Sequence, residues 1–350
     1  MSVNGLKLYQ YIIRRLILMV FVLFGVSLIV FYLGRGFPSA FDPLAQYITP
    51  KMPPGLREQI IKEHGFDQPL YVQYFFWLRD VFNGDWGFSN WANGLPVAEV
   101  FFSRFPYTVE LAVGAVILTF AVGLPLGIIS ALRNNKLPDH ISRIIALTGY
   151  STPAYWFGYL LQLVFFYYFA LWGLPSLPSR GAVSDALIGT VPRFSGIPIL
   201  DGLLAGNLRY AGDAFLHLIL PAFSLAFISL GYLARIVRAS MLEVLRQDYI
   251  TMARSKGLTE RVVIYRHALK NALIPAATLT GLFFAGLLGG ALITEFVFQW
   301  PGVGRVSLLA VFAGDSNFLL LYSLTIAAII VLANLVVDVL YVFLDPRIKY

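Results

Sequence analysis

Six long, predominantly apolar segments dominate this sequence and decide its class of fold. They cover approximately residues 12–33, 106–132, 141–171, 214–234, 272–298 and 318–344. About 20 such residues in a helix cross the hydrocarbon core of a bilayer. Only 13% of the residues are charged, whereas soluble domains carry about 25%. We therefore predict an all-α integral membrane protein with six transmembrane helices.

The basic residues indicate how these helices are oriented. Sixteen of the 26 Lys and Arg residues lie in the tails and loops on the same side as the N-terminus. Short cytoplasmic loops carry an excess of Lys and Arg, so we expect both termini to be cytoplasmic. The net charge of +7 is then a property of membrane topology and gives no reason to expect nucleic acid as a partner.

The segments divide the chain into three parts. Residues 1–33 form a cytoplasmic tail and a first span, which we expect to be retained as an anchor, and residues 34–105 form an extracytoplasmic region. In that region LREQIIKEHG and YVQYFFWLRDVFNG are typical of short helices that end at Gly65 and Gly84. Residues 106–350 form the membrane core, in which we expect Pro153 to bend the third span.

A basic loop, residues 235–272, lies between the fourth and fifth spans. From Arg235 to Lys270 it has eight cations and only three acids. Tyr249, Met252 and Ala253 share one face of a predicted helix, which Gly257 ends; Thr259 is placed to cap a second helix. The pattern favours a docking element for another protein, with a solvated basic loop as the alternative.

These residues carry a resemblance. DYITMARSKG followed by RHALKNALIP resembles the cytoplasmic coupling segment of ATP-binding-cassette (ABC) importer permeases, in the branch that imports dipeptides, oligopeptides and nickel complexes. GFDQPLYVQYFFWLRDVFNGDWGFS, TGYSTPAYWFGYLL, HLILPAFSLAF, FQWPGVGRV and LDPRIKY are similar to other parts of that branch, in the same order. Residues 172–213 match it least.

The resemblance implies a type I ABC importer permease fold in a prokaryotic cytoplasmic membrane. It implies a second, homologous permease subunit, two ATPase subunits that bind ATP and Mg, and an extracytoplasmic substrate-binding protein. The chain has no G-x-x-x-x-G-K-[ST] loop, so we expect it to bind no cofactor itself and to be no enzyme. The residues that the resemblance assigns to ATPase coupling are Asp248, Tyr249, Met252, Ala253, Arg254, Lys256, Gly257, Arg266, His267 and Asn271.

Two questions stay open at this level. Peptides are the expected substrate, with oligosaccharides or a nickel complex as alternatives and a self-sufficient secondary transporter as a remote one. Pore-lining residues are expected among small and polar positions of the third and fifth spans. Our candidates are Ser151, Thr152, Pro153, Thr278, Thr280 and Gly281.

Four ionisable residues in or beside the spans are candidates for proton, ion or metal sites. Glu110, Glu295 and Asp338 are each expected near a membrane interface, where a structural role is favoured over an ion site. His217 has no second His or Cys nearby, so we expect it to form a structural hydrogen bond rather than to bind metal. No catalytic constellation is evident.

Overall fold

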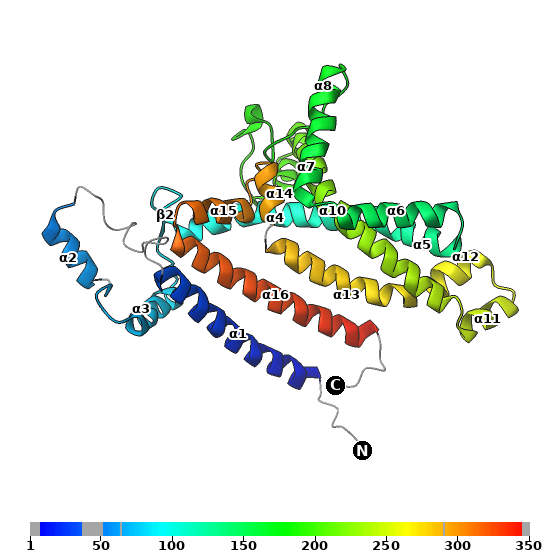
Figure 1. Cartoon of the computed structure of the whole chain (residues 1–350), viewed down its shortest axis with the longest axis horizontal. Helices are drawn as coiled ribbons and strands as arrows, with labels where there is room; N and C mark the ends of the chain where they lie inside the picture. Colours follow the sequence, from blue (N-terminus) through cyan, green and yellow to red (C-terminus); the bar gives the residue numbers. More distant parts are fainter. Residues whose placement is uncertain (1–7, 37–51, 64, 290, 345–350) are drawn as a thin grey trace.

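The protein, described here from a computed structural model, is almost entirely helical (Figure 1). The structure describes residues 8–36, 52–63, 65–289 and 291–344. Within the helices, the side chains of some positions, including 277–280 and 337–344, lie outside this description. The predicted all-α class is confirmed.

The N-terminal part consists of one long helix, two short helices and a hairpin. Their bounds are α1 (Leu8–Gly36), α2 (Pro54–Glu63), α3 (Leu70–Phe82), β1 (Phe88–Ser89) and β2 (Leu95–Pro96). The two helices predicted before Gly65 and Gly84 are confirmed, and both glycines have positive φ, which only glycine adopts at low cost. Tyr74 and Trp77 of α3 pack against Phe31 of α1.

The second span is longer than the apolar pattern predicts. It comprises α4 (Val97–Leu118), a π-helical turn η1 (Thr119–Gly123) and α5 (Leu124–Leu132). The helix begins nine residues before the predicted start, with Pro106 inside it. Its first turns are held by tertiary packing, because Val97 and Phe101 are buried against Val303 and Phe318.

The third span divides at Pro153, as predicted, but the bend is a complete break. Its elements are α6 (Leu137–Ser151), α7 (Ala154–Gln162), η2 (Leu163–Tyr168) and α8 (Phe169–Leu171). Thr152 is extended, the conformation that a residue before proline prefers. In Figure 1, α6 lies along α5 and α10, whereas α7 and α8 project away from them.

Short elements precede the central helix. They are η3 (Asp185–Leu187) and α9 (Pro198–Leu204), followed by α10 (Leu208–Val244). α10 extends beyond the predicted span, residues 214–234, at both ends. With 37 residues it is about 55 Å long at 1.5 Å per residue.

The remaining elements connect α10 to the C-terminal helix. They are α11 (Asp248–Ser255), α12 (Glu260–Val262), η4 (Val263–Ala268), α13 (Leu269–Leu288), α14 (Leu292–Val297), α15 (Val303–Phe312) and α16 (Ser316–Leu344). The fifth predicted segment, residues 272–298, is therefore shared between α13 and α14. Figure 1 shows α1, α16 and α13 side by side.

Within the part of the chain that the structure describes, five helical segments are long and apolar enough to cross a membrane. They are Ile12–Arg35, Val97–Leu132, Ala154–Leu171, Leu208–Val244 and Ser316–Val336. They correspond to predicted spans one to four and six. The described part of the fifth segment contributes α13, a helix of 20 residues.

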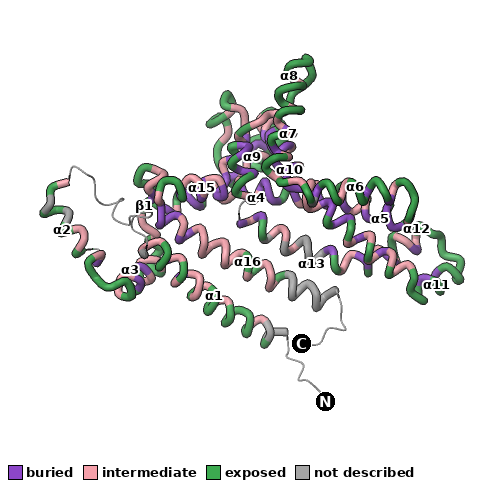
Figure 2. Tube along the Cα trace, in the orientation of Figure 1, coloured by how far each residue is buried: buried purple, intermediate pink, exposed green. Residues whose placement is uncertain are grey.

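α10 is the centre of the helix packing and the most buried of the five spans (Figure 2). It packs against α4, α5, α6 and α13. Glycines permit this close contact: a Cβ at Gly127 of α5 would lie 2.7 Å from Cβ of Val237, and one at Gly231 of α10 would lie 2.8 Å from Cα of Ala146. Small residues let helices approach closely in this way.

Candidate functional site

The segment between α10 and α13, residues 245–268, is called the connecting segment here. It lies at one extreme end of the molecule, opposite the end formed by α3, the hairpin and α15 (Figure 1). It contains α11, the turn at Gly257, α12 and η4. Seven of the ten residues assigned to coupling lie on α11 or its terminal turn, and two lie in η4.

α10 carries this segment beyond the membrane. Between Asp213 and Arg235 the helix has 21 residues and no Asp, Glu, Lys or Arg, a length of about 32 Å at 1.5 Å per residue. That matches the thickness of a bilayer's hydrocarbon core, about 30 Å. The helical stretch from Arg235 to Val244, called the stalk here, continues past this uncharged length. Val237 and Met241 pack it against α5 and α13.

One face of α11 anchors it to the rest of the chain. Ile250 and Ala253 are buried in a cluster with Val237 and Met241 of α10 and Val263 of η4. Ile250 has no solvent exposure, although our sequence analysis did not select it. Its i, i+3 spacing with Ala253 is the pattern that marks an inner face.

The side of α11 next to this buried face is exposed. Tyr249 is 40% and Met252 57% exposed, whereas Ala253 is 6% exposed. The three residues predicted to share one apolar face are thus divided: Ala253 belongs to the anchor, and Tyr249 and Met252 form an outward surface. α11 therefore presents apolar side chains to solvent from a fixed position.

Gly257 ends α11 in the predicted left-handed turn. Its φ is +78°. Its N–H donates to the carbonyl of Arg254 at 2.9 Å, and the N–H of Leu258 donates to that of Ala253 at 3.4 Å. This pair of bonds defines the Schellman motif, in which glycine is favoured because of its backbone conformation. A Cβ at Gly257 would meet nothing within 4 Å, so backbone conformation and not space selects glycine.

Two side-chain hydrogen bonds fix α11 and the turn at Gly257 that follows it. Arg254 Nε donates to Glu260 Oε1 at 2.7 Å across the turn, and Asn271 Nδ2 donates to Tyr249 Oη at 2.8 Å, which joins α11 to α13. Thr259 occupies the predicted N-cap position of α12, but its side chain makes no capping hydrogen bond. The prediction was right about the position and wrong about the bond.

The other residues assigned to coupling are polar or charged. Asp248 is exposed in the first turn of α11, where a carboxylate is favoured by the helix dipole. Lys256 and Arg266 are exposed and His267 is half-buried. Lys256 lies on α11's terminal turn, and Arg266 and His267 lie on the neighbouring η4, so this part of the chain is mostly basic.

A charged cluster that the sequence analysis did not select fixes the base of the stalk. Asp139, fully buried, accepts hydrogen bonds from Arg238 Nε at 2.7 Å, Ser130 Oγ at 2.6 Å and Arg143 Nη2 at 2.8 Å. The Arg238 guanidinium above all holds the pKa of the Asp139 carboxyl well below its ordinary value. The cluster ties α10 to the turn between α5 and α6. Asp139 and Arg238 lie 99 positions apart, so sequence spacing gave no signal.

The structure brings only part of the proposed pore set into view. Ser151 is exposed and Thr152 half-buried at the break before Pro153, where Thr152 Oγ1 donates to the carbonyl of Thr148 at 2.7 Å. Gly281 is half-buried on α13. The side chains of Thr278 and Thr280 lie outside the described residues. Pore lining by this set stays a prediction.

The described ionisable candidates form hydrogen bonds within the chain. Glu295 is completely buried and accepts hydrogen bonds from Thr108 Oγ1 and the N–H of Arg305, both at 2.9 Å. Glu110 Oε1 accepts from the N–H of Ile199 at 3.0 Å, whereas its buried Oε2 has no hydrogen-bond partner among the described residues. His217 Nδ1 lies 2.9 Å from the carbonyl oxygen of Asp213, which fits the predicted hydrogen-bonding role. The side chain of Asp338 lies outside the described residues. Among the described residues no group of three His, Cys, Asp or Glu could hold a metal ion.

Two protein-family models match this chain, one in its N-terminal part and one in the rest. Residues 123–350 match the model of the binding-protein-dependent transport system inner membrane component. Residues 8–112 match the N-terminal model of binding-protein-dependent transport system membrane components. Between them the two models span α1 to the C-terminus and include the connecting segment.

Curated relatives cover almost the same length. The chain is 41% identical over 330 residues to a probable D,D-dipeptide transport system permease protein of Escherichia coli, with 94% of each chain covered. It is 38% identical to a dipeptide transport system permease protein of Alkalihalophilus pseudofirmus and 34% identical to an oligopeptide transport system permease protein of Bacillus subtilis. Each of these alignments covers 97% of this chain and 99% of the relative. The chain therefore belongs to the family of inner-membrane components of binding-protein-dependent transport systems.

Proposed function

We propose that this permease forms one half of the path by which di- and oligopeptides enter the cell. The other half would be a homologous second permease subunit, and a binding protein outside the cell would deliver the peptide. Support for the substrate class comes from relatives named for dipeptide and oligopeptide transport, at 34–41% identity over nearly the whole chain.

The outward face of α11 is the proposed contact with a separate ATPase subunit that binds ATP and Mg. One observation carries this assignment: a short helix, anchored through Ile250 and Ala253, exposes Tyr249 and Met252 at the end of the stalk. Docking buries such side chains in a partner and lets the partner move them as one body with α10. With this end in the cytoplasm, both chain termini are cytoplasmic as well.

The test is ATP-dependent uptake into membrane vesicles that contain the complete importer. Met252→Glu places a charge on the exposed face without touching the anchor, so we expect the chain to insert normally and uptake to fall at least tenfold. Leu137→Glu, a change at an even more exposed apolar residue at the start of α6, is the matched control and should leave uptake near normal. Equal uptake by both variants would contradict the docking assignment.

The same vesicles test the substrate class. We expect a labelled dipeptide or oligopeptide to be taken up in an ATP- and binding-protein-dependent manner and to be displaced by unlabelled peptides. Displacement by oligosaccharides or a nickel complex, but not by peptides, would overturn the substrate proposal and leave the docking assignment intact.

A further inference from the structure

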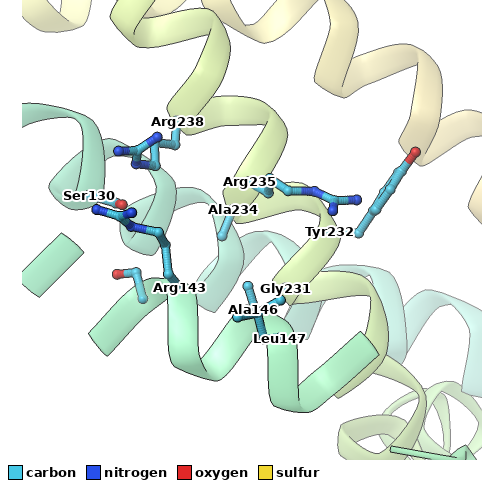
Figure 3. Close-up of a pocket in the computed structure, with 10 residues that line it drawn as sticks. Ser130, Arg143, Ala146, Leu147, Gly231, Tyr232, Ala234, Arg235 and Arg238 are labelled. Atoms are coloured by element: carbon cyan, nitrogen blue, oxygen red, sulfur yellow. The ribbon is translucent and has the colours of Figure 1, made fainter. Parts of the chain in front are cut away.

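A pocket between α6 and α10 lies beside the base of the stalk (Figure 3). Its volume is about 260 Å³, and most of its wall is apolar. Ala146 and Leu147 of α6 face Gly231 and Ala234 of α10 across it. The close contact between Gly231 and Ala146 joins the two helices at this level.

Three arginines line the same pocket. Figure 3 shows Arg143 and Arg238 on one side, near Ser130, and Arg235 on the other side, extended toward Tyr232. Arg238 is engaged by Asp139 through two nitrogens, at 2.7 and 2.9 Å. Arg143 donates to the Asp139 carboxylate through Nη2 alone, and the Arg143 side chain is 44% exposed. Arg143 therefore keeps donors for another acceptor.

Arg235 has no carboxylate partner among the described residues. Its guanidinium lies over the ring of Tyr232, 5.0 Å from the centroid, and the residue is exposed. Around the pocket three arginines thus face the single carboxylate of Asp139. The excess of positive charge favours an anionic ligand.

The depth of the pocket in the membrane identifies the kind of anion. Arg235 is the first charged residue of α10 after the uncharged stretch that crosses the hydrocarbon core, so its guanidinium lies at the level of the inner headgroups. Ala146 and Leu147 lie farther along α6 from Asp139, toward the hydrocarbon. A ligand that fits both levels has an anionic head and an apolar tail. Basic pockets between transmembrane helices on the cytoplasmic side bind such headgroups.

We propose that this pocket binds an anionic phospholipid of the inner leaflet. Its phosphate would lie between Arg143 and Arg235, and one acyl chain would follow Ala146 and Leu147. Because the lipid would contact α6 and α10 next to the Asp139 cluster, it would stabilise the base of the stalk. The inference does not depend on which substrate is transported.

The experiment uses the assembled importer in detergent, titrated with phosphatidylglycerol or with phosphatidylcholine of the same acyl chains. Bound lipid is counted by native mass spectrometry. We expect phosphatidylglycerol to be retained in preference, and Arg143→Gln and Arg235→Gln each to weaken it about fivefold, the change that corresponds to ~1 kcal/mol per basic residue at an anionic surface. The double lysine variant should retain most of the binding.

Arg209→Gln is the matched control, an exposed arginine at the opposite end of α10, and should leave lipid binding unchanged. Phosphatidylglycerol should also raise the melting temperature of the wild-type complex and not that of the double glutamine variant. Equal retention of both lipids would overturn the proposal. So would displacement by inorganic phosphate, which indicates a soluble anion, or an empty pocket in the assembled importer, which indicates that a partner subunit fills it.

Discussion

The two ends of this molecule differ in the side chains that characterise them: buried, hydrogen-bonded acids at one end and exposed apolar residues on α11 at the other. Toward the end formed by α3, the hairpin and α15, two buried acids are satisfied within the chain: Glu295 by Thr108 and the Arg305 backbone, and Asp315 by Ser89 and the N–H of Trp91. At the other end, α11 leaves Tyr249 and Met252 exposed. A buried polar group must find its partners, whereas an exposed apolar surface at a fixed position can accept one. Phe82 of α3 and Phe312 of α15 are exposed as well, so apolar exposure alone does not distinguish the two ends. The contact proposed for the second end depends on the anchored position of α11.

The largest effect that this comparison predicts is at Gly257. Proline cannot adopt the φ of +78° found there and removes the N–H that bonds to Arg254, which costs about 3 kcal/mol or more, a factor of more than ~100 in the population of the native turn. We expect Gly257→Pro to abolish ATP-dependent uptake while the chain remains in the membrane. Gly257→Asn, which tolerates a left-handed conformation, should retain most of the activity, as measured in the same vesicles. Normal uptake by the proline variant would show that the turn is not part of the coupling path.

A change at the opposite end should reduce stability and not coupling. Glu295→Ala removes the acceptor of two buried donors, and each unsatisfied donor costs about 1–3 kcal/mol. We expect a lower melting temperature and less protein in the membrane, with normal uptake per assembled importer. Glu99→Ala, at an exposed acid on α4, is the control and should change neither. A loss of uptake per importer in Glu295→Ala would break the distinction between the two ends.

The Asp139 cluster should show an intermediate effect, at the base of the stalk. Asp139→Ala removes charge-assisted hydrogen bonds from Arg238 and Arg143, worth about 1.5–3 kcal/mol each when intact, although both arginines regain some hydration. We expect a lower melting temperature by thermal denaturation in detergent and partial loss of uptake. Since the pKa of Asp139 is lowered in the folded chain, its stabilisation is present above its ordinary pKa of about 3.9 and is lost only as the pH falls through the lower value. The difference between variant and wild type should therefore be constant from about pH 5 to 8.

The smallest effect is expected at the ion pair that crosses the turn. Arg254 and Glu260 are 42% and 61% exposed in their side chains, and exposed pairs contribute about 0.2–1 kcal/mol. Arg254→Gln should lower the melting temperature by a degree or less. We expect uptake to fall less than threefold, because Arg254 lies beside the exposed apolar surface and is not part of it. If Arg254→Gln lost as much uptake as Met252→Glu, Arg254 would have to be placed at the centre of the proposed contact.

The sequence predicted the elements whose cause is local. Apolar length predicted the spans, Pro153 predicted a bend in the third span, and Gly65, Gly84 and Gly257 predicted the ends of three helices. Each of these depends on the geometry of a few consecutive residues. The coupling residues of the connecting segment could be proposed from the sequence because their motif is contiguous, and their role stays a prediction.

The features that the sequence did not predict depend on distant contacts. The early start of α4 at Val97 results from packing against α15 and α16, and the Asp139–Arg238 pair joins residues that only the fold brings together. The division of Tyr249, Met252 and Ala253 between an exposed and a buried face has the same origin. Periodicity places residues around a helix but does not say which side the rest of the chain covers.

The absence of cysteine from the chain permits a direct test of the central claim, that the outward face of α11 contacts a separate ATPase subunit. Met252→Cys would carry a single thiol on that face, and Leu137→Cys would provide an exposed thiol on a different helix, α6. In the assembled importer, we predict that a short bifunctional reagent cross-links Met252→Cys, and not Leu137→Cys, to a co-purified subunit that mass spectrometry identifies as the ATPase. A Met252→Cys thiol that forms no cross-link and reacts with a hydrophilic maleimide as fast in the importer as in the isolated chain would contradict the account.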